Sequence, residues 1–294
     1  MLDVTGISHT YGSGAKTHTA LGSITFTVEK GEIVCIVGPS GCGKSTLLRA
    51  VSGLMPPSEG ESRFMGDVID EVPVDLAFVF QEYSKSLFPW LTVRGNVAFP
   101  LKARGMSRKD RNRAVDDALG SVGLADAVDK HPWQLSGGMQ QRVSIARALA
   151  CQPALLLMDE PFASVDAQTR AELEDLLLRV RTEHGSTVLL VTHDIDESVY
   201  LGDRVLVLSG SPASIVADLT VDLPAERDQI TTRGSARFVE LRTEVARLLH
   251  NKRPAEPVPA EPVRTDEERA AEKFLAAERE ERQQQTAEVQ QGRQ

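Results

Sequence analysis

The chain has 294 residues, enough for one large domain or two small ones with a sizeable core. Its formal charge of −9 argues against an extended nucleic-acid interface, which needs clustered Lys and Arg side chains. No apolar run approaches the roughly 18 residues that cross a bilayer, and no secretory signal follows Met1, so we expect a soluble chain that reaches a membrane only through a partner.

The start of the chain contains two stretches in which apolar and polar residues alternate, a pattern typical of half-buried strands. These stretches cover residues 2–9 and 23–29, and a polar, glycine-rich segment at 12–19 lies between them. We expect them to pair as antiparallel strands at the edge of a larger sheet.

Residues 38–46 read GPSGCGKST and match the phosphate-binding loop pattern GxxxxGK(S/T) at every fixed position. An apolar strand is predicted before this phosphate loop at 33–37, and a helix after it at 44–50. Phosphate oxygens would lie at the helix N-terminus, with Lys44 supplying positive charge and Ser45 holding Mg²⁺. The strand and helix disfavour the alternative, a glycine-rich turn that fits by chance. The residues expected to bind nucleotide here are Gly38, Pro39, Ser40, Gly41, Cys42, Gly43, Lys44, Ser45 and Thr46.

The middle of the chain, at about 88–150, loses β-branched runs and gains helical patterns. Ser107, followed three residues later by Asp110, predicts a helix start. Residues 137–150 predict a second helix with one apolar face. We therefore expect an α-helical segment inserted into an α/β core.

Residues 135–138 read LSGG and form a second specific signal, the LSGG segment. Ser136 is a good N-cap, and Gly137 with Gly138 exposes the backbone N–H groups at a helix start. This second anion site lies in the helical segment and cannot easily face the phosphate loop within one chain. We therefore expect a second copy of the chain to supply the facing site.

After Pro153 the alternation of strand and helix returns, with strands predicted at 154–158, 187–192 and 204–208 and a helix at 169–183. Such alternation implies a mostly parallel sheet covered on both faces. Ligands bind such sheets at the carboxyl ends of the strands. The first two of these strands are followed by polar residues at that edge.

Asp159 and Glu160 end the first of these strands, and His193 ends the second. Asp159 is placed to meet Mg²⁺, and Glu160 to orient or deprotonate an attacking water. His193 could hydrogen-bond a γ-phosphate. Taken alone, the acidic pair could equally open a surface turn before Pro161, and a lone histidine is more often an ordinary residue. The phosphate loop favours the functional interpretation.

The C-terminal part divides into a predicted amphipathic helix at 235–250 and a polar tail at 251–294. The tail is first Pro-rich and then rich in Glu, Arg, Gln and Ala, so it cannot bury enough surface to offset its ordering entropy. We expect disorder there, with a solvated helix or a recognition segment as alternatives. We expect truncation after His250 to leave ATP turnover and dimerisation unchanged.

Together these motifs resemble the ATPase subunit of an ABC transporter over about residues 1–250. The resemblance implies a P-loop (RecA-like) α/β core with an antiparallel β subdomain and an inserted α-helical subdomain. It further implies Mg²⁺-dependent ATP hydrolysis by a head-to-tail dimer of two copies, with two ATP molecules at the interface. In that dimer Ser136, Gly137 and Gly138 contact the γ-phosphate held by the other copy.

The resemblance also assigns roles to single residues. Tyr11 would stack on adenine, Gln81 would reach Mg²⁺ and the attacking water, and Asp166 would lie in a loop that crosses the dimer interface. Leu usually precedes that Asp in the family, and Val165 departs from the pattern. The expected catalytic residues are Lys44, Gln81, Glu160 and His193, and the expected metal ligands are Ser45, Gln81 and Asp159.

A narrower resemblance points to importers of the nitrate, sulfonate and taurine group. It rests on QEY at 81–83, LFPWLTV at 87–93 and NVAF at 96–99, with residues 84–86 lengthening the loop. The aromatic residues Phe88, Trp90 and Phe99 either pack the helical core or help to grip the permease, or do both.

We therefore expect an ATP-hydrolysing importer subunit, cytoplasmic and peripheral on the inner face of the cell membrane. Its partners would be a second copy, integral membrane permease subunits and, indirectly, an extracytoplasmic solute-binding protein, without nucleic acid. An exporter subunit, a non-transport ABC ATPase of DNA repair or translation, and a nucleotide-regulated interaction module are the alternatives. Three scattered cysteines, Cys35, Cys42 and Cys151, fit buried or loop thiols in a reducing cytosol.

Overall fold

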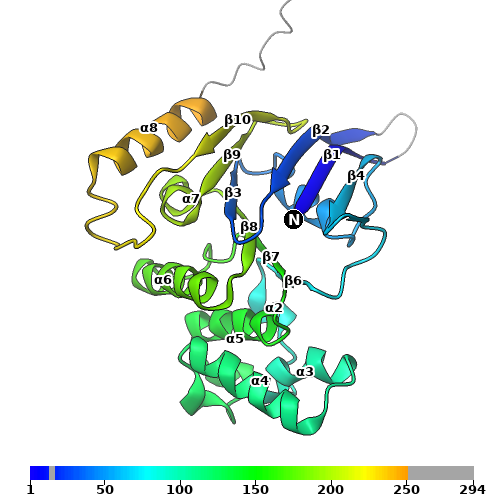
Figure 1. Ribbon diagram of the computed structural model, residues 1–294, viewed down its shortest axis with the longest axis vertical. Helices are drawn as coiled ribbons and strands as arrows, with labels where there is room; N and C mark the ends of the chain where they lie inside the picture. The colour runs from blue at the N-terminus through cyan, green and yellow to red at the C-terminus, as the bar shows by residue number, and fades with distance from the viewer. Residues whose placement is uncertain (13–16, 251–294) are drawn as a thin grey trace, which may run out of the picture. The chain divides into compact units, whose positions relative to one another are not determined.

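Two β-sheets organise residues 1–12 and 17–250, the part of the chain that this computed structural model describes (Figure 1). The larger sheet has six strands in the order β10-β9-β3-β8-β7-β6, parallel except for the β9–β10 pair. Its strands are β3 (Ile33–Val37), β6 (Leu76–Val79), β7 (Leu155–Asp159), β8 (Thr187–Thr192), β9 (Arg204–Leu208) and β10 (Ile215–Thr220).

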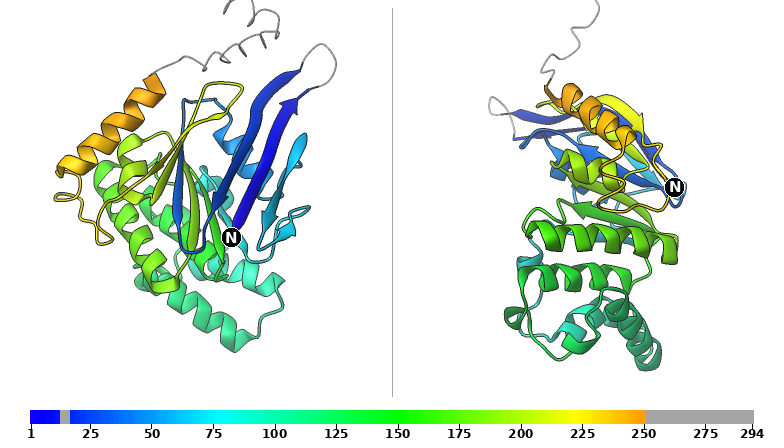
Figure 2. Two further views of the ribbon diagram at one scale, coloured as in Figure 1. Left: turned by 45° about the horizontal axis from the view of Figure 1, so that its top comes forward. Right: turned by 90° about the vertical axis from the view of Figure 1, so that its left-hand side faces the viewer.

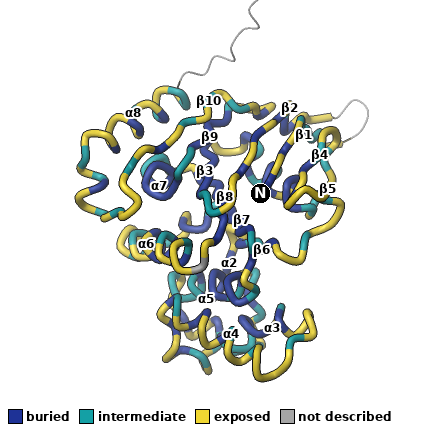
Figure 3. The backbone as a smooth tube through the Cα atoms, in the orientation of Figure 1, coloured by how far each residue is buried: buried dark blue, intermediate teal, exposed yellow. Residues whose placement is uncertain are grey.

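The central strands of this sheet are buried on both faces. In β3 the side chains of Ile33, Cys35 and Val37 join the core on one face, and those of Val34 and Ile36 join the core on the other. Their near-continuous burial is visible in the dark centre of Figure 3. The expected parallel sheet, covered on both sides, is therefore confirmed.

The first strands of the chain pair antiparallel, as predicted, but their place in the fold corrects one expectation. They do not extend the edge of the large sheet but form a separate four-stranded antiparallel sheet in the order β2-β1-β4-β5. Its strands are β1 (Leu2–Tyr11), β2 (His18–Val28), β4 (Glu59–Phe64) and β5 (Asp67–Val68). Helix α1 (Lys44–Val51) packs its buried side chains into the core that the two sheets share. Strand alternation specifies a buried face but not which sheet a strand joins.

Three helices cover the face of the large sheet that lies opposite α1, as the two orientations in Figure 2 show. They are α6 (Ala167–His184), α7 (Ile195–Leu201) and α8 (Ala236–His250). Helix α8 buries Phe238, Leu241 and Val245, the apolar face that the sequence predicted. The predicted polar tail at 251–294 lies outside the described residues.

A helical segment connects β6 to β7 and lies at the lower end of the molecule in the view of Figure 1. Ser107 and Ser136 cap two of its helices, because their side-chain oxygens accept the backbone N–H of Asp110 and Met139 respectively. The segment consists of α2 (Tyr83–Ser86), α3 (Val93–Ala103), α4 (Arg108–Ser121), η1 (Ala125–Ala127), η2 (Pro132–Gln134) and α5 (Gly137–Leu149).

Candidate nucleotide-binding site

The three central strands of the large sheet place the candidate residues at one edge. Strand β8 pairs with β3 on one side and with β7 on the other, all parallel. The register sets Val37 opposite Thr192 and Asp159 opposite Val191. The next residues along the chain, which include Glu160 and His193, therefore follow at the same carboxyl edge of the sheet.

The phosphate loop closes on itself through Lys44. Gly43, the N-cap of α1, has φ of 111°, and a Cβ there would lie 2.9 Å from the carbonyl oxygen of Ala20. Lys44 follows it and is only 5% exposed. Its Nζ donates to the carbonyl oxygens of Gly38 at 2.9 Å and Pro39 at 3.1 Å. A buried ammonium is thus held where the loop's backbone N–H groups gather.

Ser45 and Asp159 bring a hydroxyl and a carboxylate together. The Oγ of Ser45 donates to Oδ1 of Asp159 at 3.0 Å, and Asp159 is 4% exposed. Burial raises the pKa of the Asp159 carboxyl, and the hydrogen bond from Ser45 opposes that rise. Oxygen donors of this kind suit Mg²⁺.

No group of three or more His, Cys, Asp or Glu side chains within residues 1–12 and 17–250 is arranged to hold a metal ion. The Ser45–Asp159 pair therefore fits Mg²⁺ only with additional oxygen ligands. Mg²⁺ keeps several waters and is usually bound together with the phosphates of a substrate. The chemistry of the donor set accordingly suits Mg²⁺ that arrives with a nucleotide.

Glu160 is the point at which the expected catalytic side chains meet. Its Oε2 accepts a hydrogen bond from Nε2 of Gln81 at 3.1 Å and lies 3.1 Å from Nδ1 of His193. Its Oε1 lies 3.8 Å from Nζ of Lys44. Glu160 has φ of 42°, and its N–H donates to the carbonyl of Val191 at 2.8 Å. A non-glycine residue in this region costs roughly 1–3 kcal/mol, and such strain concentrates at functional sites.

Tyr11 lies beside the phosphate loop at the end of β1. Its hydroxyl is 3.0 Å from Oγ1 of Thr46, on the first turn of α1. The ring is 41% exposed and meets the His9 ring edge-on, with 4.5 Å between centroids. A partly exposed aromatic ring therefore lies next to the loop, and its stacking on a base stays a prediction.

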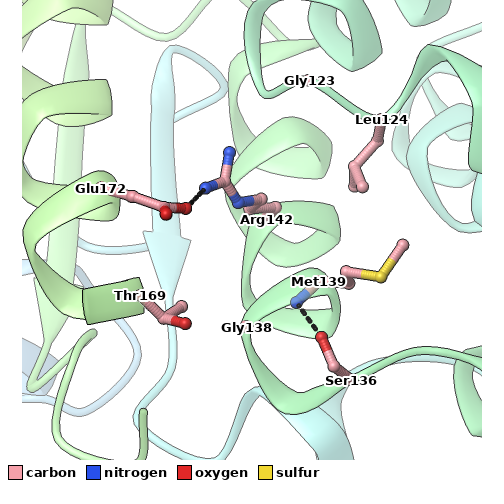
Figure 4. Close-up of a pocket in the computed structure, with 8 residues that line it drawn as sticks. All are labelled: Gly123, Leu124, Ser136, Gly138, Met139, Arg142, Thr169 and Glu172. Atoms are coloured by element: carbon pink, nitrogen blue, oxygen red, sulfur yellow. Dashed lines mark hydrogen bonds and ion pairs between the residues drawn. The ribbon is translucent and has the colours of Figure 1, made fainter. Parts of the chain in front are cut away.

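The LSGG segment lies apart from the phosphate loop within the described chain. Ser136 caps α5, with 3.3 Å between its Oγ and the backbone nitrogen of Met139. Among the described residues no hydrogen bond or ion pair joins 38–46 to 136–138. A depression of about 420 Å³ adjoins the helix start, where Arg142 reaches toward Glu172 of α6 (Figure 4). One chain thus presents two separate helix starts, and anion binding at each stays a prediction.

The carboxylate of Asp166 accepts hydrogen bonds from a residue of its own chain, Thr169. Asp166 is the N-cap of α6 and accepts from the N–H of Thr169 at 3.0 Å and from its Oγ1 at 2.7 Å. The backbone N–H of Thr169 is the largest cause of the lowered pKa of Asp166. The capped turn fixes the start of α6, and its role between two copies stays a prediction.

Sequence reasoning missed two pairings near the site. Arg170, one turn into α6, donates to Asp194 with 3.1 Å between Nη1 and Oδ2. Asp194 directly follows His193 and caps α7 by accepting the N–H of Glu197. Tyr83, two residues after Gln81, is buried with its hydroxyl 3.4 Å from the carbonyl oxygen of Ser164. No local pattern signals contacts between residues 24 and 81 positions apart.

The described residues contain no helix that is both long and apolar enough to cross a membrane. A phosphate loop between two sheets, together with an LSGG segment on an inserted helical segment, defines an ATP-binding cassette. The ABC transporter family matches residues 21–163.

Relatives extend this match beyond the cassette core. The bicarbonate transport ATP-binding protein CmpD of Synechocystis sp. is 41% identical over 254 residues, which cover 85% of this chain and 89% of the relative. The nitrate import ATP-binding protein NrtD of the same organism is 40% identical over 256 residues, 85% of this chain and 96% of the relative. The chain belongs to the ABC transporter family as an ATP-binding protein, and its resemblance to the nitrate importer group is confirmed.

Solved structures confirm the predicted fold class. The ATP-binding cassette MJ0796, described as a dimer in a post-hydrolysis state bound to ADP and Pi, has a TM-score of 0.67 at 33% identity, covering 75% of this chain and 99% of that one. CbiO1 from Clostridium perfringens, part of the ABC transporter complex cbiONQ, has a TM-score of 0.68 at 30% identity, covering 75% and 88%.

Proposed function

We propose that this chain is the Mg²⁺-dependent ATPase subunit of an ABC importer for a small solute of the nitrate class. The observation that carries the proposal is the convergence of Lys44, Gln81 and His193 on the carboxylate of Glu160. The nitrate and bicarbonate relatives support import and a small anionic solute. An exporter subunit and a non-transport ABC ATPase remain the alternatives.

In the proposed reaction the chain contributes positioning and charge. Lys44 exchanges its carbonyl partners for phosphate oxygens, with the N–H groups of the phosphate loop around them. Ser45 and Asp159 would hold Mg²⁺ that arrives with the nucleotide, and the ion would supply positive charge beside the phosphates. Glu160 orients the attacking water and accepts its proton, while Gln81 and His193 hold that carboxylate in place.

A second copy completes each site in this proposal. The start of α5, at Ser136 to Gly138, faces the terminal phosphate held by the other copy, and Asp166 lies at the same interface. The separation of the two anion sites within one chain supports this arrangement. So does the dimeric form of the related cassette MJ0796, which is bound to ADP and Pi.

The proposed membrane partner is a permease that contacts an aromatic cluster formed by Phe88, Trp90 and Phe99. The Phe88 ring lies 5.5 Å from that of Trp90 and 4.5 Å from that of Phe99, measured between centroids. Trp90 is 71% exposed and Phe99 47%. Exposed apolar rings that pack on one another suit a protein contact. The chain would thereby lie at the inner face of the membrane and meet a solute-binding protein only indirectly.

The test has two parts. Purified chain should hydrolyse ATP only with Mg²⁺, and Lys44→Ala should abolish turnover. Arg237→Ala on α8, which breaks exposed ion pairs with Asp222 and Glu240, should leave turnover unchanged. Tagged chain isolated from cells should carry an integral membrane protein. Absence of Mg²⁺-dependent turnover, or recovery with ribosomes or DNA instead of a membrane protein, would overturn the proposal.

A further inference from the structure

We propose that Tyr83 is a positioning residue that joins the Gln81 segment to the start of the LSGG helix α5. In this proposal Gly137 and Gly138 are needed for close contacts inside the chain, in addition to any role toward a second copy. The inference rests on the proposed ATPase function for its kinetic readout. The close packing of Tyr83, Gly137 and Gly138 is visible in the folded chain without reference to that function.

Tyr83 touches three functional segments at once. It begins α2, two residues after Gln81, and is 7% exposed. Its hydroxyl donates to the carbonyl of Ser164, with 3.4 Å between the oxygens, in the loop that leads to Asp166. The same hydroxyl would lie 2.9 Å from a Cβ built on Gly137. A single side chain therefore spans the Gln81 segment, the LSGG segment and the loop before α6.

Gly138 makes a second close approach, to a different element. A Cβ built there would lie 2.4 Å from Cγ2 of Thr169 on α6. Thr169 cannot easily turn away, because its Oγ1 donates to Asp166 at 2.7 Å and a β-branched side chain has few χ1 rotamers. Consecutive helix residues point about 100° apart, so the two glycines meet two different neighbours.

The backbone itself does not require glycine at these positions. Gly137 and Gly138 have φ outside the left-handed region, and alanine is favoured over glycine in a helix. Lack of space is therefore what disfavours a methyl group. At Gly137 the methyl group would crowd the Tyr83 hydroxyl, and at Gly138 it would crowd the Thr169 methyl group. The sequence alone showed only that glycine exposes N–H groups at a helix start.

The last residue of α2, Ser86, also hydrogen-bonds to α5. Arg147 donates from Nη1 to the carbonyl of Ser86 at 2.6 Å and from Nη2 to its Oγ at 2.9 Å. Helix α2 is thus attached at its first residue through Tyr83 and at its last through Ser86. Tyr83 lies at the first turn of α5 and Ser86 contacts its last turn, so a displacement of the Gln81 segment would move α5 as a unit.

The experiment pairs a substitution that adds a methyl group at a glycine with one that removes the neighbouring atom, both in the full-length chain. Gly137→Ala should lower turnover at saturating ATP by about tenfold or more, since small misplacements of catalytic groups have large kinetic effects. Tyr83→Phe removes only the hydroxyl, so the double variant Gly137→Ala/Tyr83→Phe should return to within about threefold of Tyr83→Phe alone. The KM for ATP should change little in each case.

Gly138→Ala provides an independent second pair. Thr169→Ser removes the methyl group that a Cβ would meet and keeps the hydroxyl that bonds Asp166. Gly138→Ala/Thr169→Ser should therefore recover, whereas the crossed pairs Gly137→Ala/Thr169→Ser and Gly138→Ala/Tyr83→Phe should not. The crossed pairs serve as the matched controls.

The midpoint of thermal unfolding gives a readout that does not need turnover. Each alanine variant should unfold at a lower temperature than the wild type, and only its own matched partner should restore the midpoint. Wild-type activity and stability in Gly137→Ala, or equal recovery by matched and crossed pairs, would overturn the inference. Absence of turnover in the wild type would instead count against the proposed function, while the unfolding pattern would still decide the packing.

Discussion

Oε2 of Glu160 lies 3.1 Å from Nδ1 of His193, and this contact joins the ends of two neighbouring strands, β7 and β8. The side chain of Glu160 is 17% exposed and that of His193 is 51% exposed. The carboxylate is therefore partly sheltered, while the imidazole has a free side toward solvent. Such an arrangement suits a base that is held from one side and meets a water on the other.

Glu160→Gln should reduce ATP turnover by at least about 100-fold while ATP still binds. The amide keeps the size of the side chain but cannot accept a proton from water, and general-base catalysis contributes about 10²–10⁴. Phosphate release under saturating Mg²⁺-ATP measures the effect. Glu244→Gln, an exposed carboxylate on α8, is the control and should retain the wild-type rate. Turnover at the wild-type rate in Glu160→Gln would remove Glu160 from its assigned role.

The ring of Tyr11 should affect the KM for ATP more than its hydroxyl does. Tyr11→Phe loses the contact with Thr46 but keeps the aromatic face, so the KM for ATP should change less than about threefold. Tyr11→Ala loses base stacking worth about 1 kcal/mol, which corresponds to a KM about fivefold higher. Steady-state kinetics of the two variants distinguishes the contributions. An equal rise in KM for both variants would show that the hydroxyl, not the ring, carries the effect.

Glu197 should make stability depend on pH. Its side chain is buried, with the residue 3% exposed, and its Oε1 has no hydrogen-bond partner. Burial raises the pKa of the Glu197 carboxyl well above the ordinary value of 4.5. The charges of Glu174 and Asp194 add to this rise, whereas Thr192 and Arg170 oppose it. The folded chain therefore keeps this proton to higher pH than the unfolded chain does. The free energy of unfolding should fall as pH rises from about 4.5 through the raised pKa.

Glu197→Gln removes that ionisation. Relative to the wild type, the variant should gain about 1.4 kcal/mol for each pH unit across this interval. Urea unfolding at a series of pH values between about 5 and about 8 measures the two curves. Parallel curves for wild type and variant would show that Glu197 titrates alike in the folded and unfolded chains.

Trp90→Ala should separate permease contact from ATP chemistry. Trp90 is 71% exposed on the aromatic cluster, so its loss should leave the turnover of the isolated chain unchanged within about twofold. Recovery of the membrane partner with tagged chain should fall by about fivefold or more, since exposed aromatic anchors dominate contact energies. Trp133→Ala removes another exposed Trp, at 66%, and is the control. Equal recovery for Trp90→Ala and wild type would place the permease contact elsewhere.

Much of the candidate site could be predicted because each motif residue stands at a fixed offset from a strand end. Ser45, on the first turn of α1, and Asp159, at the end of β7, are 114 positions apart, yet they meet at the same sheet edge, where their side chains form a 3.0 Å hydrogen bond. Glycine spacing and apolar runs were sufficient for this, since parallel strands share one carboxyl edge.

Other features depend on tertiary packing that no local pattern encodes. The Tyr83 contact with Gly137 and the Arg170–Asp194 pair join elements whose mutual placement follows only from the folded core. The separate N-terminal sheet has the same cause, because α1 lies between it and the large sheet. Strand β10 alternates between half-buried and exposed residues over six positions, but its apolar residues do not follow that alternation, because Val216 lies at an exposed position, so the pattern does not identify a strand.

In the proposed function a second copy completes each ATP site. The molar mass of the Glu160→Gln variant in solution, which distinguishes monomer from dimer, tests this. The variant should bind ATP without hydrolysing it. With Mg²⁺-ATP we expect a dimer that carries one nucleotide per chain, and a monomer without nucleotide. Ser136→Arg on the same background should bind ATP yet stay monomeric, since the change lies at the start of α5. A Glu160→Gln chain that binds Mg²⁺-ATP and remains a monomer at every concentration would show that no second copy completes the site.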